Sequence, residues 1–465
     1  MSDPDTRTEP PPPIPARTWW IAAVTGAGAF LAMLDSTVAN LALESIRADL
    51  GSTLGLVQWV ATAYLVSLAL SLPAAGWLGG RYGYGRLWAA SLAAFVVASV
   101  LCALAPGLPA LIGARVLQGL AAGLMVPAGQ AVIGSVAGAS QLGRLMGALG
   151  VVISLGPAVG PAVGGLLLEA VSWRWLFWIN VPVGVAALIA ARGLVPAGAT
   201  SAARPLDLRG LVLLGVGLSL LLYGGTEAGS AGPSALPVVA VVSGAVLAAG
   251  FVLTALRGAH PLIDLRLLRR PTFAWATLTT GFTGANMYSG LLLLPLYLQL
   301  TQDRDGAQTG LLLLAMGLGS AAALYLGGSL SDRYGAGGVT LAGAAILVLT
   351  TLPFLATDTP AAPLLIVVLI ARGAGVALAQ MPATAAAYAS VATAEIGDAT
   401  TLVNIVQRVG GAVGAAGVVV VLAQAGASSD GDGYAWAFAA LTALSFLTLV
   451  SAAFLRRAEQ AQKAG

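Results

Sequence analysis

Apolar runs of about twenty residues recur from one end of this 465-residue chain to the other. Only 9% of the residues are charged, whereas a soluble domain carries roughly 25%. A run of roughly 20 apolar residues is long enough to cross the hydrocarbon core of a bilayer as a helix. The sequence therefore predicts an all-α membrane protein.

The apolar runs divide into fourteen candidate spanning helices. Each run ends at a cluster of polar, glycine or proline residues. The seventh run is the shortest. The candidate spans are residues 18–43, 54–78, 87–104, 108–132, 142–168, 175–194, 208–223, 236–256, 273–298, 310–327, 339–356, 363–385, 400–422 and 434–455.

The basic residues indicate how these spans are oriented. Lys and Arg collect in cytoplasmic loops. With the N-terminus inside, only Arg47, Arg174 and Arg304 fall in outer loops, and Arg115, Arg372 and Arg408 fall within spans, out of 22 basic residues. The asymmetry predicts an even number of helices with both termini in the cytoplasm, as a multi-pass protein of the cytoplasmic membrane.

A short repeat predicts two related halves. GWLGGRYGYG at 76–85 returns as GSLSDRYGAG at 328–337, a shift of 252 residues. Both copies close a predicted span on the cytoplasmic side, and repeated halves are typical of secondary transporters. Because six helices need fewer residues than this shift, we expect a disordered tail (1–17), a six-helix bundle (18–198), a linker with an extra two-helix hairpin (199–258), a second six-helix bundle (259–456) and a cytosolic tail (457–465).

Asp35 is the only acidic residue well inside a predicted span. A carboxylate in a bilayer costs a few kcal/mol and therefore suggests a function. Arg115 is its expected partner, because both residues lie about 10–12 Å below the outer surface at roughly 1.5 Å per helical residue. A structural carboxylate hydrogen-bonded within the bundle is the alternative. If the pair opens during transport, Asp35 could gain and lose a proton.

The fifth span contains GPAVGPAVGG at 156–165. Gly156, Gly160 and Gly164 recur on one helix face, which favours close packing against another helix. Pro157 and Pro161 remove backbone hydrogen bonds and bend a helix. We expect this face to serve a rocking interface or a seal against proton leak, and ordinary tight packing is the alternative.

Polar, aromatic and methionine side chains within spans are candidates for the substrate cavity. Many such residues only make interhelical hydrogen bonds or sit at the membrane interface, and we expect fewer than half to touch substrate. Met side chains supply adaptable apolar contacts. The candidates are Gln58, Trp59, Thr62, Tyr64, Gln118, Met125, Asn286, Tyr288, Tyr297, Gln299, Gln380, Met381 and Asn404.

The inventory of reactive side chains argues against an enzyme. The chain has one cysteine, Cys102, and one histidine, His260. A disulfide framework or a Cys- or His-based metal site is therefore not expected, and neither is a cofactor. Nucleic acid is not an expected partner.

These motifs resemble the major facilitator superfamily, and in particular its fourteen-helix drug:proton antiporters. LDSTVANLAL (34–43), WVATAYLVSLALSLPAAG (59–76), RVLQGLAAG (115–123), GPAVGPAVGG (156–165), WRWLFWINVPVG (173–184) and HPLIDLRLLRRPTF (260–273) are similar to segments of that family. The resemblance implies a proton-coupling role for Asp35 and Arg115. It implies a conformational role for the loop motif and its second copy, through Gly76, Arg81, Gly83, Arg86, Asp332 and Arg333.

Three positions depart from the family pattern. Gly80 stands where the first loop motif normally has an aspartate, although Asp332 keeps that aspartate in the second copy. Ala315 lies near an expected proline, and the order Gln407–Arg408 is often reversed in relatives. The span 310–327 has no acid, which favours neutral, zwitterionic or monocationic amphipathic substrates.

The sequence thus predicts a proton-coupled exporter of small amphipathic compounds that works by alternating access. Its partners would be the substrate, protons and the lipid bilayer, and we expect a monomer. An importer or facilitator of a small metabolite with the same fold is the alternative, which the glycine–proline segment of the fifth span argues against.

Overall fold

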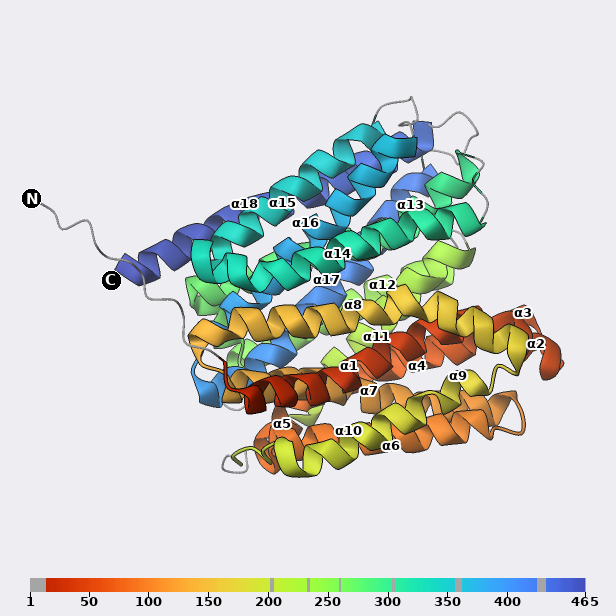
Figure 1. The fold of residues 1–465 in the computed structure, drawn as a ribbon, viewed down its shortest axis with the longest axis horizontal. Helices are drawn as coiled ribbons and strands as arrows, with labels where there is room; N and C mark the ends of the chain where they lie inside the picture. The colour runs from red at the N-terminus through yellow and green to blue at the C-terminus, as the bar shows by residue number, and fades with distance from the viewer. Residues whose placement is uncertain are drawn as a thin grey trace, which may run out of the picture.

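The computed structural model describes residues 14–200, 205–231, 235–258, 261–302, 304, 306–355, 362–424 and 432–464. Within these ranges the regular elements are helices, and none is a strand. Figure 1 shows the long helices lying side by side along one common direction. The prediction of an all-α chain is confirmed for the described residues. Most of the predicted tail 1–17 lies outside them.

The first half of the chain runs from α1 to α10. A 3-10 turn interrupts the second apolar run at Leu72–Ala74, where Pro73 lacks a backbone N–H. The elements are α1 (Ala16–Leu41), α2 (Leu43–Asp49), α3 (Leu54–Val57), α4 (Trp59–Ser71), η1 (Leu72–Ala74), α5 (Ala75–Tyr82), α6 (Tyr84–Ala103), α7 (Leu108–Val136), α8 (Ala139–Ala170), α9 (Trp175–Trp178) and α10 (Asn180–Leu194).

The rest of the chain comprises α11 to α18. The last helix continues to Ala464, so the predicted cytosolic tail at 457–465 is helical as far as the structure describes it. The elements are α11 (Leu208–Ala231), α12 (Ala235–Arg257), η2 (Leu265–Arg269), α13 (Pro271–Leu300), α14 (Gly306–Tyr334), α15 (Ala336–Thr351), η3 (Leu352–Leu355), α16 (Ala362–Ala389), η4 (Thr393–Glu395), α17 (Ile396–Gln424) and α18 (Asp432–Ala464).

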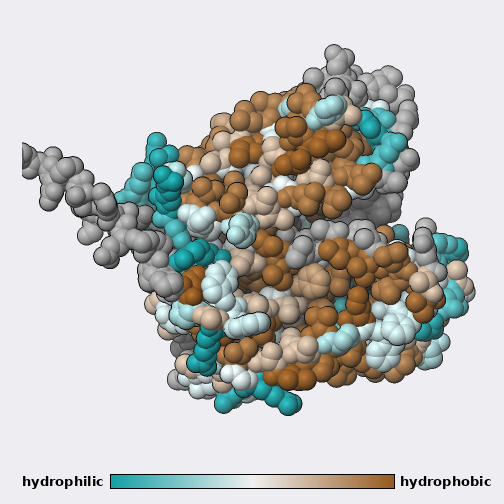
Figure 2. All heavy atoms as spheres, in the orientation of Figure 1, coloured by the Kyte–Doolittle hydropathy of each residue, from teal (hydrophilic) through white to brown (hydrophobic). Residues whose placement is uncertain are grey.

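Eleven helical segments among the described residues are long and apolar enough to cross a membrane. Three further long helices, α8, α11 and α13, have 32, 24 and 30 residues. The space-filling view shows apolar residues over the middle of the molecule and hydrophilic ones near its two ends (Figure 2). The chain is therefore a multi-pass membrane protein, and the number fourteen stays a prediction.

The two stretches α1–α10 and α13–α18, called here the first and second halves, repeat the same packing. α1 packs against α8 and α10, as α13 packs against α17 and α18. α7 packs against α4 and α6, as α16 packs against α14 and α15. Gly83 and Gly335, 252 residues apart, both end a helix with positive φ, at 91° and 80°. α11 packs against α12, α4 and α17. The division into two bundles and a hairpin stays a prediction.

The halves meet near the end of the molecule at which α1 begins and α18 ends, called here the terminal end (Figure 1). Arg144 at the start of α8 pairs with Asp332 at the end of α14, with 3.0 Å between Nε and Oδ2. Gln130 of α7 accepts hydrogen bonds from Tyr388 of α16 at 3.1 Å and from Asn404 of α17 at 2.6 Å. Figure 1 shows the halves diverging toward the opposite end, where α2 and α3 lie.

Candidate functional site

Asp35 lies in α1 with none of its surface exposed. Its carboxylate forms an ion pair with Arg115 of α7. Gln118, one turn further along α7, donates its Nε2 to Oδ1 at 2.8 Å. Asn180 of α10 donates its Nδ2 to the same oxygen at 3.0 Å. A buried ion pair is stable only when further hydrogen bonds satisfy its remaining atoms, and two side chains from two neighbouring helices, Gln118 and Asn180, do so here.

A close approach of two helices places Arg115. A Cβ on Gly119 would lie 2.1 Å from Ser67 Oγ and 2.3 Å from the Tyr64 carbonyl oxygen, so only glycine lets α7 approach α4 this closely. One turn earlier, Arg115 donates its Nε to the Val60 carbonyl at 2.9 Å. Its guanidinium lies 4.2 Å from the centre of the Tyr64 ring, and that arrangement attracts a cation to the face of the ring.

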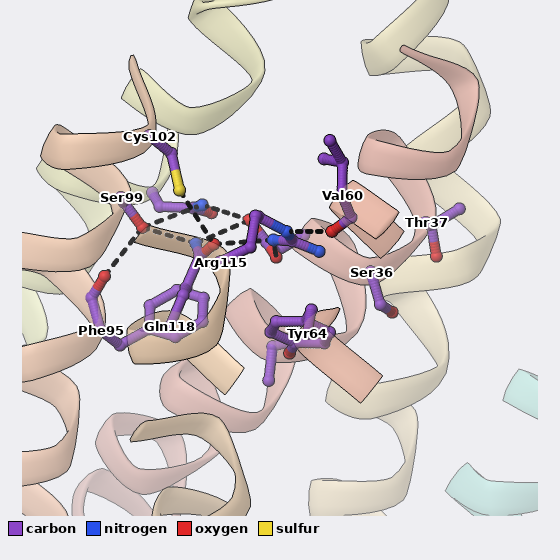
Figure 3. A network of polar contacts seen from close by, with 12 residues as sticks. Ser36, Thr37, Val60, Tyr64, Phe95, Ser99, Cys102, Arg115 and Gln118 are labelled. Atoms are coloured by element: carbon purple, nitrogen blue, oxygen red, sulfur yellow. Dashed lines mark hydrogen bonds and ion pairs between the residues drawn. The ribbon is translucent and has the colours of Figure 1, made fainter. Parts of the chain in front are cut away.

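Gln118 links the charged pair to α6, as the close view shows (Figure 3). Its Oε1 accepts from Arg115 Nη1 at 2.7 Å, and its Nε2 donates to Ser99 Oγ at 2.8 Å as well as to Asp35. Ser99 donates in turn to the Phe95 carbonyl at 2.9 Å. These partners fix the orientation of the Gln118 amide. A change in the charge of Asp35 would therefore be felt in α1, α4, α6, α7 and α10 together.

Sequence reasoning missed two members of this network, Ser99 and Asn180. Asn180 opens α10 and is fully buried. Asn180 is the only amide side chain in the apolar segment WRWLFWINVPVG. That isolated polar residue could have marked it as a member of the network. Ser99 gives no such signal, because serine is common in membrane helices and often bonds the backbone one turn earlier.

Three of the cavity candidates in the first half belong to the interior of that half. Tyr64 and Gln118 contact the Arg115–Asp35 pair. Met125 is fully buried against Gly28 of α1, whose added Cβ would lie 3.0 Å from its sulfur. Tyr64 and Gln118 therefore support the charged network, Met125 packs α7 against α1, and direct contact with substrate stays a prediction for all three.

The remaining candidates of the first half lie on α4 or just before it. Thr62 is buried, Gln58 is half-buried, and Trp59 is 43% exposed. Trp59 stacks on Tyr223 of α11, with 5.9 Å between ring centres. Trp59 is thus turned toward the helix pair α11–α12.

The candidates of the second half are dispersed. Asn286 is fully buried and accepts from Arg372 at 2.7 Å. Tyr297 lies in an aromatic cluster with Phe354, Tyr434 and Phe438. Tyr288 and Gln299, on the same helix, are exposed.

Three further candidates lie on α16 and α17. Asn404 bonds Gln130 across the halves. Met381 faces Gly150 of α8, where an added Cβ would lie 3.1 Å from its Cγ. Gln380 is buried beside it in the sequence. Two of the predicted cavity residues thus lie at the contact between the halves.

The first loop motif closes α5 against the start of α6. Gly83 has φ of 91°, and an added Cβ there would lie 2.3 Å from the Ala197 carbonyl oxygen. Gly76 faces α17, since its added Cβ would lie 3.1 Å from Asp398 Oδ1. Arg81 and Arg86 are exposed. The motif therefore packs backbone on backbone at the terminal end.

The second copy of the motif also lies at the terminal end, and it contains charged side chains. Asp332 pairs with Arg144, and Arg333 lies exposed with its guanidinium 5.2 Å from the centre of the Tyr334 ring. Gly80 in the first copy offers no carboxylate. The two copies consequently differ in chemistry although both contact the other half.

The glycine face of α8 packs against another helix of the first half. Gly156 faces Met33 and Leu34, and Gly160 faces Thr37, all on α1 of the same half. Gly164 faces Leu41 and Val38 of α1. This face thus packs closely against α1, and its role as a rocking interface or a seal against proton leak stays a prediction. The side chains of Pro157 and Pro161 lie outside the described residues.

The opposite stretch of α8 contacts the second half instead. Gly147 and Gly150 face Leu324 of α14, and Gly143 lies near Ser331 and Asp332. This earlier row of glycines was not recognised in the sequence.

A salt bridge joins two segments at the end of the molecule opposite the terminal end. Arg174 and Trp173 donate to Oδ2 of Asp49, at 2.8 Å and 3.0 Å. The hydrogen bond from Arg174, followed by that from Trp173, lowers the pKa of the Asp49 carboxyl. The segment between α8 and α9 is thereby joined to α2.

Comparisons with known proteins identify the family of this chain. The family model described as Major Facilitator Superfamily matches residues 25–415. The chain belongs to the major facilitator superfamily. This is a family of transporters rather than of enzymes.

Curated relatives cover most of this superfamily member. It is 34% identical over 407 residues to a protein of Mycobacterium tuberculosis named multidrug resistance protein B homolog, covering 86% of this chain and 75% of the relative. It is 34% identical to the puromycin resistance protein of Streptomyces alboniger, covering 86% and 81%. The solved proton:xylose symporter XylE shares the fold, with a TM-score of 0.67 at 14% identity over 95% and 96% of the two chains.

Proposed function

We propose that this protein is a proton-coupled antiporter that exports small amphipathic compounds. One observation carries the proposal, namely the fully buried ion pair of Asp35 and Arg115 within the first half. A superfamily member that only moved an apolar solute would have no need to bury this acid. The names of its relatives, which refer to multidrug and puromycin resistance, support an exported drug or antibiotic.

The coupling step would be a proton binding to Asp35. The ionised carboxylate accepts from Arg115, Gln118 and Asn180. A protonated carboxyl loses the attraction of the Arg115 cation and one of its acceptor positions. Arg115 and Gln118 would then shift, and because they bond to α4 and α6, those helices would shift with them.

The conformational cycle would rock the two halves around the middle of the membrane. We propose fourteen spans with both termini in the cytoplasm, which makes the terminal end cytoplasmic. The Arg144–Asp332 and Gln130–Asn404 contacts would then close the cytoplasmic side. Protonation of Asp35 from outside would favour return to the inward-open state after the substrate has left.

An importer or facilitator of a small metabolite remains the second candidate. The fold alone supports it, because XylE is a proton:xylose symporter with the same architecture. The two directions differ in what a proton gradient does. An antiporter accumulates substrate in the compartment that is acidic, and a symporter empties it.

Inside-out membrane vesicles distinguish these candidates. Vesicles from cells that express the chain are made acidic inside by ATP hydrolysis, and uptake of ethidium and puromycin is followed. The proposal expects uptake above that of vector vesicles, and an uncoupler abolishes it. Proton-driven loss of a compound from the vesicles would favour the importer, and equal movement with and without the uncoupler would contradict proton coupling.

A further inference from the structure

Arg372 of α16 is a buried cation that forms no ion pair with an acid among the described residues. It is 1% exposed. Its Nη2 donates to Oδ1, the side-chain amide oxygen, of Asn286 in α13 at 2.7 Å, whereas its Nη1 has no hydrogen-bond partner among the described residues. The apolar stretches of the second half, at 273–298, 310–327, 339–356, 363–385, 400–422 and 434–455, contain no Asp or Glu. No carboxylate within those stretches can therefore neutralise it.

Equivalent packing in the two halves matches Arg372 with Gln118. An added Cβ on Gly119 would meet Ser67 Oγ and the Tyr64 carbonyl, and one on Gly373 would meet Ser320 Oγ and the Met316 carbonyl. Gln118 and Arg372 each directly precede that glycine.

The hydrogen-bond partners of Gln118 and Arg372 also occupy equivalent helices. Gln118 bonds to Asp35 of α1, whereas Arg372 bonds to Asn286 of α13, the helix that packs in the second half as α1 does in the first. A carboxylate in one half thus corresponds to a neutral amide in the other.

The amide cannot neutralise the arginine. A buried charge that lacks a partner is strongly destabilising, and an arginine does not lose its proton in a protein. Asn286 is itself held by Ser445, to which its Nδ2 donates at 2.6 Å. Gly290 lets the guanidinium lie against bare backbone, with an added Cβ only 3.0 Å from Nη2. The neighbouring Ser289 is fully buried, and its hydroxyl has no hydrogen-bond partner among the described residues.

We propose that Arg372 binds one monovalent anion, with Asn286 holding the guanidinium in place. The charge of the anion would replace the carboxylate that the first half supplies through Asp35. Two sources offer this chemistry: a free inorganic anion such as chloride, or a carboxylate on the transported molecule. The guanidinium takes either, since its N–H groups bind planar carboxylates and single anions alike.

Thermal unfolding of the purified full-length protein tests the site without any transport measurement. Unfolding is followed in sodium gluconate, chloride, bromide or formate at one fixed ionic strength. A ligand that binds the native state raises the unfolding temperature, here by on the order of 2–4 °C. A rise in chloride and bromide identifies a free halide as the source. A rise in formate alone identifies a carboxylate of the substrate.

Two variants and one matched control assign the effect to Arg372. Arg372→Gln should lose the anion-dependent rise. Asn286→Asp should lose it too, because the new carboxylate supplies the counter-charge within the protein, and this variant serves if Arg372→Gln does not fold. Arg408→Gln removes another arginine of the same half, which is only half-buried, and should keep the rise. No anion effect on the unchanged protein, or an equal effect in Asn286→Asp, would overturn the proposal.

Discussion

The two halves of this protein place polar clusters at equivalent positions but give them different charges. In the first half, Asp35 and Arg115 neutralise each other, and Gln118 and Asn180 complete the shell. In the second half, Arg372 bonds the amide of Asn286 and no acid among the described residues. One cluster can exchange a proton at a carboxylate and the other cannot. We therefore propose that proton exchange takes place in the first half alone.

The largest effect is expected for Arg115→Gln. The change leaves Asp35 as an uncompensated buried charge, at a cost of about 3–5 kcal/mol. Proton-driven transport should fall at least 100-fold, and the unfolding temperature of the purified protein should drop. Arg115→Lys keeps the charge but cannot reproduce the fork of donors that reaches Asp35, Gln118 and Val60, so it should retain only part of the transport. Full transport by Arg115→Gln would contradict the proposal that the Asp35–Arg115 pair couples proton movement to transport.

A smaller effect is expected for Asn180→Leu. Ser445 is the corresponding residue of the second half, because it bonds Asn286 as Asn180 bonds Asp35. Asn180→Leu removes a donor to the Asp35 carboxylate, and loss of such a donor disfavours the ionised form. Transport at neutral pH should fall roughly tenfold, since a donor to a charged group contributes about 1.5 kcal/mol. Its pH profile should move to higher pH.

Ser445→Ala is the matched control for Asn180→Leu. It removes the acceptor of Asn286 in the second half, whose predicted spans contain no Asp or Glu. Its pH profile should stay where the unchanged protein has it. A shifted profile in Ser445→Ala would show that the second half also takes part in proton exchange.

The smallest effect belongs to the contact between the halves. Arg144 and Asp332 are partly exposed, with side-chain exposures of 24% and 18%. Pairs of this kind contribute about 1 kcal/mol or less. A double-mutant cycle of Arg144→Ala and Asp332→Ala, read by thermal unfolding, should give a coupling of that size. The exchanged pair Arg144→Asp with Asp332→Arg should restore much of it, and zero coupling would mean that this bridge does not hold the halves together.

The helices and the Asp35–Arg115 pairing could be predicted because each rests on a local or one-dimensional signal. Apolar length marks the helices, and equal depth from the outer surface brings the two charged residues to one level. Asn180 and Ser99 were missed, because their relation to Asp35 depends on which faces of α6 and α10 turn inward. The glycines at Gly156, Gly160 and Gly164 do predict a close helix contact. Their spacing does not say whether the partner helix lies in the same half.

The central claim, that Asp35 carries the coupled proton, is tested most directly by proton movement in liposomes. Purified protein is reconstituted with a pH-sensitive dye inside, and an outward gradient is imposed of a compound that moves in the vesicle assay. The unchanged protein should acidify the interior as the compound leaves. Asp35→Asn should fold, shown by an unchanged unfolding profile, and should give no acidification, with Asp35→Glu retaining part of it. Acidification by Asp35→Asn at the rate of the unchanged protein would contradict the account.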